Sequence, residues 1–120
     1  MLMSENEFFD TLQDFEIVDF SSDDYESIDL DDYLGGFIRW INPPSKKTNW
    51  LIKEYHSTCI LMNIQLNTHT NQVCLLLKFP KTGKLISMDS NKKDRVIYFK
   101  PNKKQRIRRM FANLVVNKVD

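Results

Sequence analysis

A run of positive charge near the end of the chain is the strongest chemical signal in the sequence. The stretch "KPNKKQRIRRMF" (100–111) holds six Lys and Arg in ten consecutive positions, whereas the 120-residue chain has a formal net charge of only +1. The six are Lys100, Lys103, Lys104, Arg106, Arg108 and Arg109. Lys and Arg neutralise phosphates whatever the base sequence, and this term dominates nucleic-acid affinity. The run therefore predicts a nucleic-acid surface.

Charge is divided sharply between two parts of the chain. Residues 1–34 contain twelve Asp and Glu and no Lys or Arg, whereas residues 35–120 contain all seventeen basic residues and four acidic ones. Such asymmetry is typical of a nucleic-acid surface, of an acidic interaction arm, or of both. We therefore expect an acidic helical arm over 1–34 and a basic sheet-plus-helix domain over 35–120, with a hinge at Gly35 and Gly36.

The histidines and cysteines do not suggest a metal site or a catalytic site. The chain has two of each, His56, Cys59, His69 and Cys74. In the hairpin expected over 59–79, the two cysteines lie about 13 Å apart, which is too far for one tetrahedral ion. No histidine has a nucleophile and an orienting acid at a recognisable spacing, and the clustered acids are more simply an acidic helix than a metal-dependent nuclease. We expect a non-enzymatic protein without metal or cofactor.

Two helices are expected in the acidic segment. Ser4 and Glu7 form a capping box, and the Phe and Leu residues of "FFDTLQDF" then recur at helical spacing. The second stretch, "SSDDYESIDLDDYLGG", begins with serine caps and with acids that suit the helix dipole, and Gly35 would end it.

After residue 36 the apolar pattern changes from helical to alternating, which indicates strands. The strand-like segments are "FIRWIN", "TNWLIKEY", "TCILMNIQL", "QVCLLLKF", "KLISMD" and "RVIYFK". Because turn-forming residues separate the last four, we expect an antiparallel meander. Pairing Leu66 with Asn71 across "NTHTN" gathers one apolar set on a single face: Ile60, Met62, Ile64, Val73, Leu75 and Leu77.

A helix is expected after Pro101, which ends the last strand. Its apolar residues follow the i, i+3, i+4, i+7 spacing of a helix with one buried face: Ile107, Met110, Phe111, Leu114 and Val115. The predicted fold is therefore α+β, with an acidic N-terminal helical segment, an antiparallel β-meander of four to six strands and one C-terminal α-helix packed on the sheet.

Over about residues 37–119, this order of elements resembles the whirly and PUR families and the positive-cofactor-four coactivators. Those families bind single-stranded nucleic acids, usually as dimers. The resemblance implies single-strand binding and a homodimer, and it transfers no site residue because it is one of element order alone.

We predict a protein that binds single-stranded DNA or RNA in transcription, replication or RNA handling. Aromatic rings beside cations on an open sheet face suit unstacked bases, so Trp50 and Tyr98 are candidate stacking residues. The predicted cations are Lys78, Lys84, Lys92, Lys93, Lys100, Lys103, Lys104, Arg106, Arg108 and Arg109.

Three roles are open for the acidic segment. It could pack on the sheet and complete the core, or it could cover the basic surface as a tethered nucleic-acid mimic, at an effective concentration in the millimolar range. It could also bind a partner protein, because it alternates acids with large apolar residues. Under the last two roles, removing 1–34 would strengthen nucleic-acid binding.

The alternative function belongs to a different class, a small viral or phage-type inhibitor or adaptor. Its acidic arm would occupy a basic groove on a partner protein. The residues predicted to bind that partner are Phe15, Ile17, Asp31 and Asp32.

The sequence favours a cytoplasmic or nuclear protein with no membrane partner. No apolar run approaches the roughly 18 residues of a membrane span. The start "MLMSENEFFD" lacks the basic and apolar regions of a signal peptide, and two cysteines suit a reducing compartment.

Overall fold

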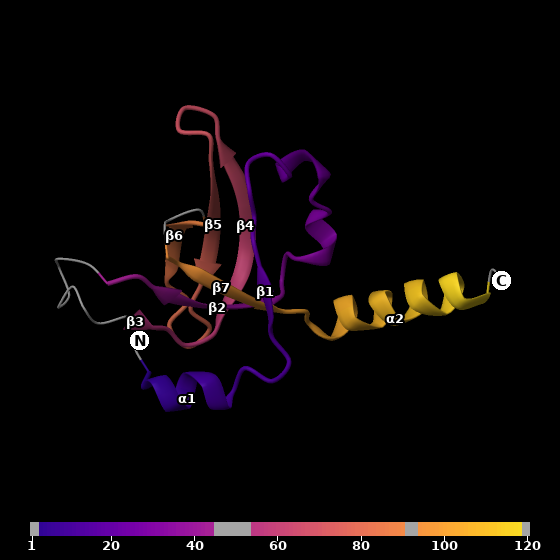
Figure 1. The fold of residues 1–120 in the computed structure, drawn as a ribbon, viewed down its shortest axis with the longest axis horizontal. Helices are drawn as coiled ribbons and strands as arrows, with labels where there is room; N and C mark the ends of the chain where they lie inside the picture. The colour runs from indigo at the N-terminus through magenta and orange to yellow at the C-terminus, as the bar shows by residue number, and fades with distance from the viewer. Residues whose placement is uncertain (1–2, 45–53, 91–93, 119–120) are drawn as a thin grey trace.

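The computed structural model describes residues 3–44, 54–90 and 94–118. Its elements, shown in Figure 1, are α1 (Glu5–Asp10), β1 (Glu16–Val18), the 3₁₀ turns η1 (Tyr25–Ser27) and η2 (Leu30–Asp32), β2 (Phe37–Asn42), β3 (Glu54–Tyr55), β4 (Cys59–Asn67), β5 (Gln72–Lys78), β6 (Leu85–Asp89), β7 (Val96–Lys100) and α2 (Lys103–Lys118). The predicted α+β class is confirmed, with an N-terminal helix, an antiparallel sheet and a C-terminal helix.

Within the described residues, seven strands form one sheet in the order β1-β7-β2-β4-β5-β6, with the short β3 paired to β2. Strands β4, β5 and β6 follow one another as a meander, as expected. Strand β7 does not continue it, because the chain crosses back and inserts β7 between β1 and β2. There both backbone edges of β7 find partners, and its apolar Ile97 and Phe99 are buried.

The sheet bends where β2 meets β4, because only Phe37 and Ile38 of β2 pair with that strand. Figure 1 shows β4 and β5 standing across the direction of β2 and β7. The core fills the inside of this bend and consists mainly of inward-facing strand residues: Ile38, Trp40, Cys59, Leu61, Ile64, Val73, Leu75, Leu77, Ile97 and Phe99.

The β4–β5 hairpin has a different register from the predicted one. Leu66 pairs with Val73 and not with Asn71, so the pairing is displaced by two residues. A displacement of two leaves each side chain on the predicted face of the sheet, since side chains alternate with a period of two. A bulge between Leu61 and Asn63 then moves the earlier residues of β4 to the opposite face. Leu61 is therefore buried, and Met62, predicted to be buried, is exposed.

Local hydrogen bonds set the length of this hairpin's turn, which spans residues 68–71. The side-chain oxygen of Asn67 accepts the backbone N–H groups of His69 at 3.0 Å and of Thr70 at 3.4 Å. Asn71 adopts a left-handed φ of 55°, which Asn tolerates better than most residues. The turn therefore closes with four residues and not with the five expected.

The acidic segment packs on both faces of the sheet, with Phe8 on the outer face and Phe20 in the core. Phe8 is 0% exposed and its ring lies 5.4 Å from that of Tyr55 and 5.6 Å from that of Tyr98. Phe20 is buried, and Tyr33 packs edge-on against it. Completion of the core, the first role considered for this segment, is confirmed; a domain boundary at residue 34 stays a prediction.

The second helix predicted in this segment is wrong, because the chain forms the two 3₁₀ turns η1 and η2 there. Short polar side chains compete with helical hydrogen bonds at these positions. Ser21 donates its hydroxyl to the Asp24 carboxylate at 3.0 Å, and the Asp29 carboxylate accepts the Asp31 N–H at 3.1 Å. Gly35, at a φ of 89°, then turns the chain into β2.

Helix α2 packs on the sheet through its first turns, where the Arg109 guanidinium lies 5.8 Å from the Phe99 ring centroid. The close approach needs Gly36, because a Cβ there would lie 2.4 Å from Cε1 of Phe99 and 3.0 Å from Oε1 of Gln105. Beyond these turns the helix extends away from the body (Figure 1).

The apolar stripe of α2 is exposed, which corrects the prediction that it is buried. The sequence pattern indicates an amphipathic helix but cannot say what covers its apolar face. The Val115 side chain lies outside the described part of the chain. The other stripe residues are between 42% and 64% exposed: Ile107, Met110, Phe111 and Leu114.

Replacing Phe8 with Ala should cost about 3–5 kcal/mol of unfolding free energy, because it empties a fully buried site. The neighbouring Phe9, which is 46% exposed, is the matched control, and its replacement with Ala should cost clearly less. Urea unfolding of both variants measures the difference. Equal losses would show that α1 is not held on the sheet by Phe8 in this way.

Candidate functional site

The basic run lies at one end of the sheet, beside the acidic segment. Lys100 ends β7, and its Nζ lies 3.8 Å from a carboxylate oxygen of Asp14. On α2, Arg109 Nη1 lies 3.3 Å from Glu16 Oε1 of β1. The run therefore meets acids that precede it in the chain by more than eighty residues.

Arg108 forms a second contact between α2 and the acidic segment. Its guanidinium nitrogens lie 4.0 Å from an oxygen of Asp29 and 3.7 Å from one of Asp32. All three side chains are about half exposed, so water screens the pairs. Ion pairs of this kind contribute about 0–1 kcal/mol each and can be displaced by another anion.

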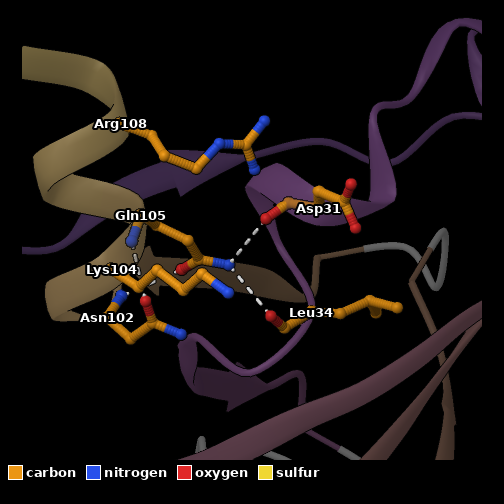
Figure 2. A pocket seen from close by; sticks show the side chains of 6 residues that line it. All are labelled: Asp31, Leu34, Asn102, Lys104, Gln105 and Arg108. Carbon is orange, nitrogen blue, oxygen red and sulfur yellow. Dashed lines mark hydrogen bonds between the residues drawn. The ribbon is translucent and has the colours of Figure 1, made fainter. Parts of the chain in front are cut away.

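Gln105 joins α2 to the acidic segment by buried hydrogen bonds (Figure 2). The side chain is 3% exposed, and its Nε2 donates to the backbone oxygens of Asp31 at 3.2 Å and Leu34 at 3.0 Å. Its Oε1 accepts the Asn102 N–H at 2.9 Å, while Asn102 Oδ1 accepts the Gln105 N–H at 2.9 Å. This reciprocal capping box starts the helix and fixes its rotation.

A pocket of about 390 Å³ lies at this junction. Figure 2 shows Lys104 and Arg108 reaching from the helix on either side of Gln105, with the backbone oxygens of Asp31 and Leu34 facing Gln105 from the acidic segment. The pocket is thus lined by two cations from the helix and by Asp31 and Leu34 from the acidic segment.

Three cations at the start of α2 are exposed: Lys103, Lys104 and Arg106. None of them forms an ion pair with another residue of the described ranges. They lie at the helix end that already carries a partial positive charge, so an external anion is the natural counter-charge.

The sheet register brings Lys78 into line with Lys100. Lys78 pairs with Ile60, Ile60 with Phe37, and Phe37 with Lys100, so the four form one row across β5, β4, β2 and β7. We call this the cross-sheet row. All four side chains lie on the face opposite the core and are partly exposed. The two Lys backbones are about 14 Å apart at the usual strand spacing.

The predicted cations are therefore only partly brought together. Lys84 is exposed in the turn that follows Lys78, but the residue that continues the row is its neighbour Leu85, which pairs with Lys78. Lys92, Lys93 and Trp50 lie outside the described residues. Phe37 was missed by the sequence reasoning, although the alternation of "FIRWIN" places its first residue on the outer face.

Tyr98 faces outward on β7, but its ring packs against Phe8. Burial raises the pKa of its phenol above the usual value, with a smaller contribution from Tyr55. The ring can stack on a base only where α1 leaves it open, so Phe37 is the better candidate.

The residues predicted to bind a partner protein are dispersed. Phe15 lies between two cations, with its ring centroid 5.0 Å from Arg39 Cζ and 5.9 Å from Lys100 Nζ. Asp31 and Asp32 lie against α2. Ile17 is the exception, because it is 70% exposed on the edge strand β1.

Two further arrangements are absent from residues 3–44, 54–90 and 94–118. No group of three or more His, Cys, Asp or Glu side chains there is arranged to hold a metal ion. None of the helices in the same ranges is both long and apolar enough to cross a membrane.

Comparison with protein-family models, with curated proteins and with solved structures finds no match. The function must therefore be argued from the chain's own geometry.

Replacing Gln105 with Leu should cost at least about 2 kcal/mol of unfolding free energy. The change leaves two backbone oxygens and the Asn102 N–H without their partner, and each such loss costs about 1–3 kcal/mol. Gln13, which is exposed, is the matched control, and Gln13→Leu should stay within about 0.5 kcal/mol of the parent chain. Similar losses in urea unfolding of the two variants would contradict the role of Gln105 in holding α2.

Proposed function

We propose that the chain is a non-enzymatic protein that binds single-stranded DNA or RNA in the cytoplasm or nucleus. One observation carries the proposal: the cross-sheet row sets Lys78 and Lys100 on either side of Phe37. The row then continues through Lys100 toward the exposed cations at the start of α2. Transcription, replication and RNA handling all need such a protein.

The combination of ring and charge favours a single strand over a duplex. A base freed from stacking can lie on an aromatic ring, and this contact is worth about 1–3 kcal/mol per base. Cations on both sides of Phe37 would hold the phosphates that flank such a base. In a duplex the bases are stacked on one another, so the ring would have no partner.

The acidic segment competes with nucleic acid for the same cations. Its carboxylates hold Lys100, Arg108 and Arg109 in weak, exposed ion pairs. A phosphate chain that displaces them frees Lys100 of the cross-sheet row and gains two further cations, Arg108 and Arg109. The segment therefore modulates binding while it also completes the core.

Binding should depend on salt and on the cations of α2. If the chain neutralises about five phosphates of a single strand, log affinity should fall with log salt at a slope of about −3.5. Replacing Lys103, Lys104 and Arg106 with Ala should make the slope of log affinity against log salt less negative by about 2. Fluorescence anisotropy with a labelled oligonucleotide measures both slopes.

The matched control for this triple variant keeps the charges and exchanges the side chains, as Lys103→Arg, Lys104→Arg and Arg106→Lys. Phosphate contacts depend on charge, so the control should retain the parent slope. A slope near zero for the parent chain, or the same slope in the Ala variant, would rule out this interface.

Releasing Arg108 should strengthen binding. The double change Asp29→Asn and Asp32→Asn removes both of its partners, and Asn at 29 keeps an oxygen that can accept the Asp31 N–H. We expect about threefold to tenfold higher oligonucleotide affinity. Deleting 1–34 cannot serve as this test, because it would remove the buried Phe8 and Phe20.

The control for this test neutralises two acids of the same segment, as Asp23→Asn and Glu26→Gln. Neither side chain forms an ion pair with another described residue. If the two double variants bind equally, the gain comes from net charge alone and the competition at Arg108 is not supported.

The second candidate is the adaptor function, and the exposed Ile17 favours it. A groove beside β1 is lined by this side chain and by acids that include Glu16, Asp19 and Asp29. A basic, partly apolar peptide would fit that lining. An adaptor of this kind, whether viral or not, would bind its partner tightly and oligonucleotides only weakly, with a shallow salt slope.

A further inference from the structure

The apolar stripe of α2 faces away from the body of the protein. Gln105, Arg108 and Arg109 contact the acidic segment, so their side of the helix faces inward. Leu114 follows Gln105 by nine residues, which at about 100° per residue puts it on the opposite side. The inward side of the helix is thus polar and the outward side apolar, the reverse of an ordinary surface helix.

We propose that this stripe is the interface of a homodimer in which α2 pairs with α2 of a second copy in antiparallel orientation. The stripe is self-complementary under a two-fold axis between residues 110 and 111. Ile107 then faces Leu114 of the second copy, and Met110 faces Phe111 of the second copy. Thioether groups pack favourably against aromatic rings, and a symmetric dimer uses one patch twice.

Charge selects the antiparallel orientation. A parallel pair would place Lys103, Lys104 and Arg106 beside their own copies. In the antiparallel pair, Lys104 and its copy are about 20 Å apart at 1.5 Å per residue, which is beyond the screening length of about 8 Å. Each cationic helix start then lies near the other helix's C-terminal end, which carries a partial negative charge.

The two-fold complementarity of the stripe and the charge pairing of the antiparallel arrangement make a second copy the occupant that we propose. Glu16, Asp29 and Asp32 lie against the inward side of α2, away from the stripe, and do not enter the contact. The inference does not rest on the proposed nucleic-acid function, because the stripe and the free cations occupy different positions on the helix.

The dimer should be weak. Four side chains from each copy form an interface below the roughly 1,200 Å² of standard stable complexes. We expect a dissociation constant on the order of micromolar. Sedimentation equilibrium of the full chain without nucleic acid, from micromolar to near-millimolar concentration, should show a mass rising from 14.3 kDa toward twice that value.

Leu114→Glu should weaken self-association about tenfold or more, because it places a carboxylate in an apolar contact. Asn113→Glu adds the same charge beside the stripe and is the matched control, with little effect expected. Both positions are exposed, so neither change should unfold the body. A parent chain that stays monomeric throughout, or two variants that weaken association equally, would overturn the proposal.

Cysteine cross-linking tests the orientation in a Cys74→Ser background. The remaining Cys59 is buried, and burial raises the pKa of its thiol to about 11, so it stays unreactive. An antiparallel pair brings Met110→Cys next to its own copy and separates Ile107→Cys from its copy by about 10 Å along the axis. Cross-linking of both variants would show a parallel pair, and cross-linking of neither would exclude this interface.

If Leu114→Glu leaves a monomeric chain unchanged but abolishes its binding to vesicles of anionic phospholipid, the stripe is a membrane-surface element and the dimer is wrong. Oligonucleotide binding by the same variant, measured below the dissociation constant of the dimer, should equal that of the parent. This comparison separates a failure of the dimer from a failure of the nucleic-acid interface.

Discussion

The carboxamide of Gln105 donates hydrogen bonds to two backbone oxygens of the acidic segment, and these bonds fix which side of α2 faces the body. With this rotation set, Arg108 and Arg109 meet carboxylates, while Lys103 and Lys104 stay exposed. The apolar stripe is turned outward by the same constraint. A buried amide costs free energy unless its partners are present, so the Gln105 contact fixes the position of α2 more specifically than the exposed ion pairs around it.

The acidic segment and the basic run meet around Gln105, but their ion pairs do not neutralise every cation of the run. Among the described residues, four ion pairs link the acidic segment to the end of β7 and to α2, and all of them are at least partly exposed. The packing of the acidic segment on the sheet is therefore separable from its ion pairs with the basic run. Phe20 holds the segment in the core and Phe8 holds it on the outer face of the sheet, while its carboxylates remain available for exchange with an external anion. A protein built in this way can release cations to a ligand without unfolding.

Local patterns in the sequence were enough to predict the fold class, most strands and the N-cap at Ser4, because each depends on neighbouring residues. The capping box that Asn102 and Gln105 form was not recognised. Long-range choices were not predictable. Strand β7 has partners on both edges only because β1, which is distant in the chain, pairs beside it. Whether the α2 stripe is buried or exposed depends on the rotation of the helix that Gln105 sets. The cross-sheet row could not be predicted either, since Phe37 meets Lys100 by direct pairing of β2 with β7, and Lys78 joins them only through Ile60 of β4.

Backbone amide shifts in a titration with a single-stranded oligonucleotide test the central claim most directly. The account predicts that the largest shifts lie along the cross-sheet row and the start of α2, with further shifts at Asp29 and Asp32 as Arg108 is released. Shifts confined to the groove beside β1, or no shifts at a saturating oligonucleotide concentration, would contradict it.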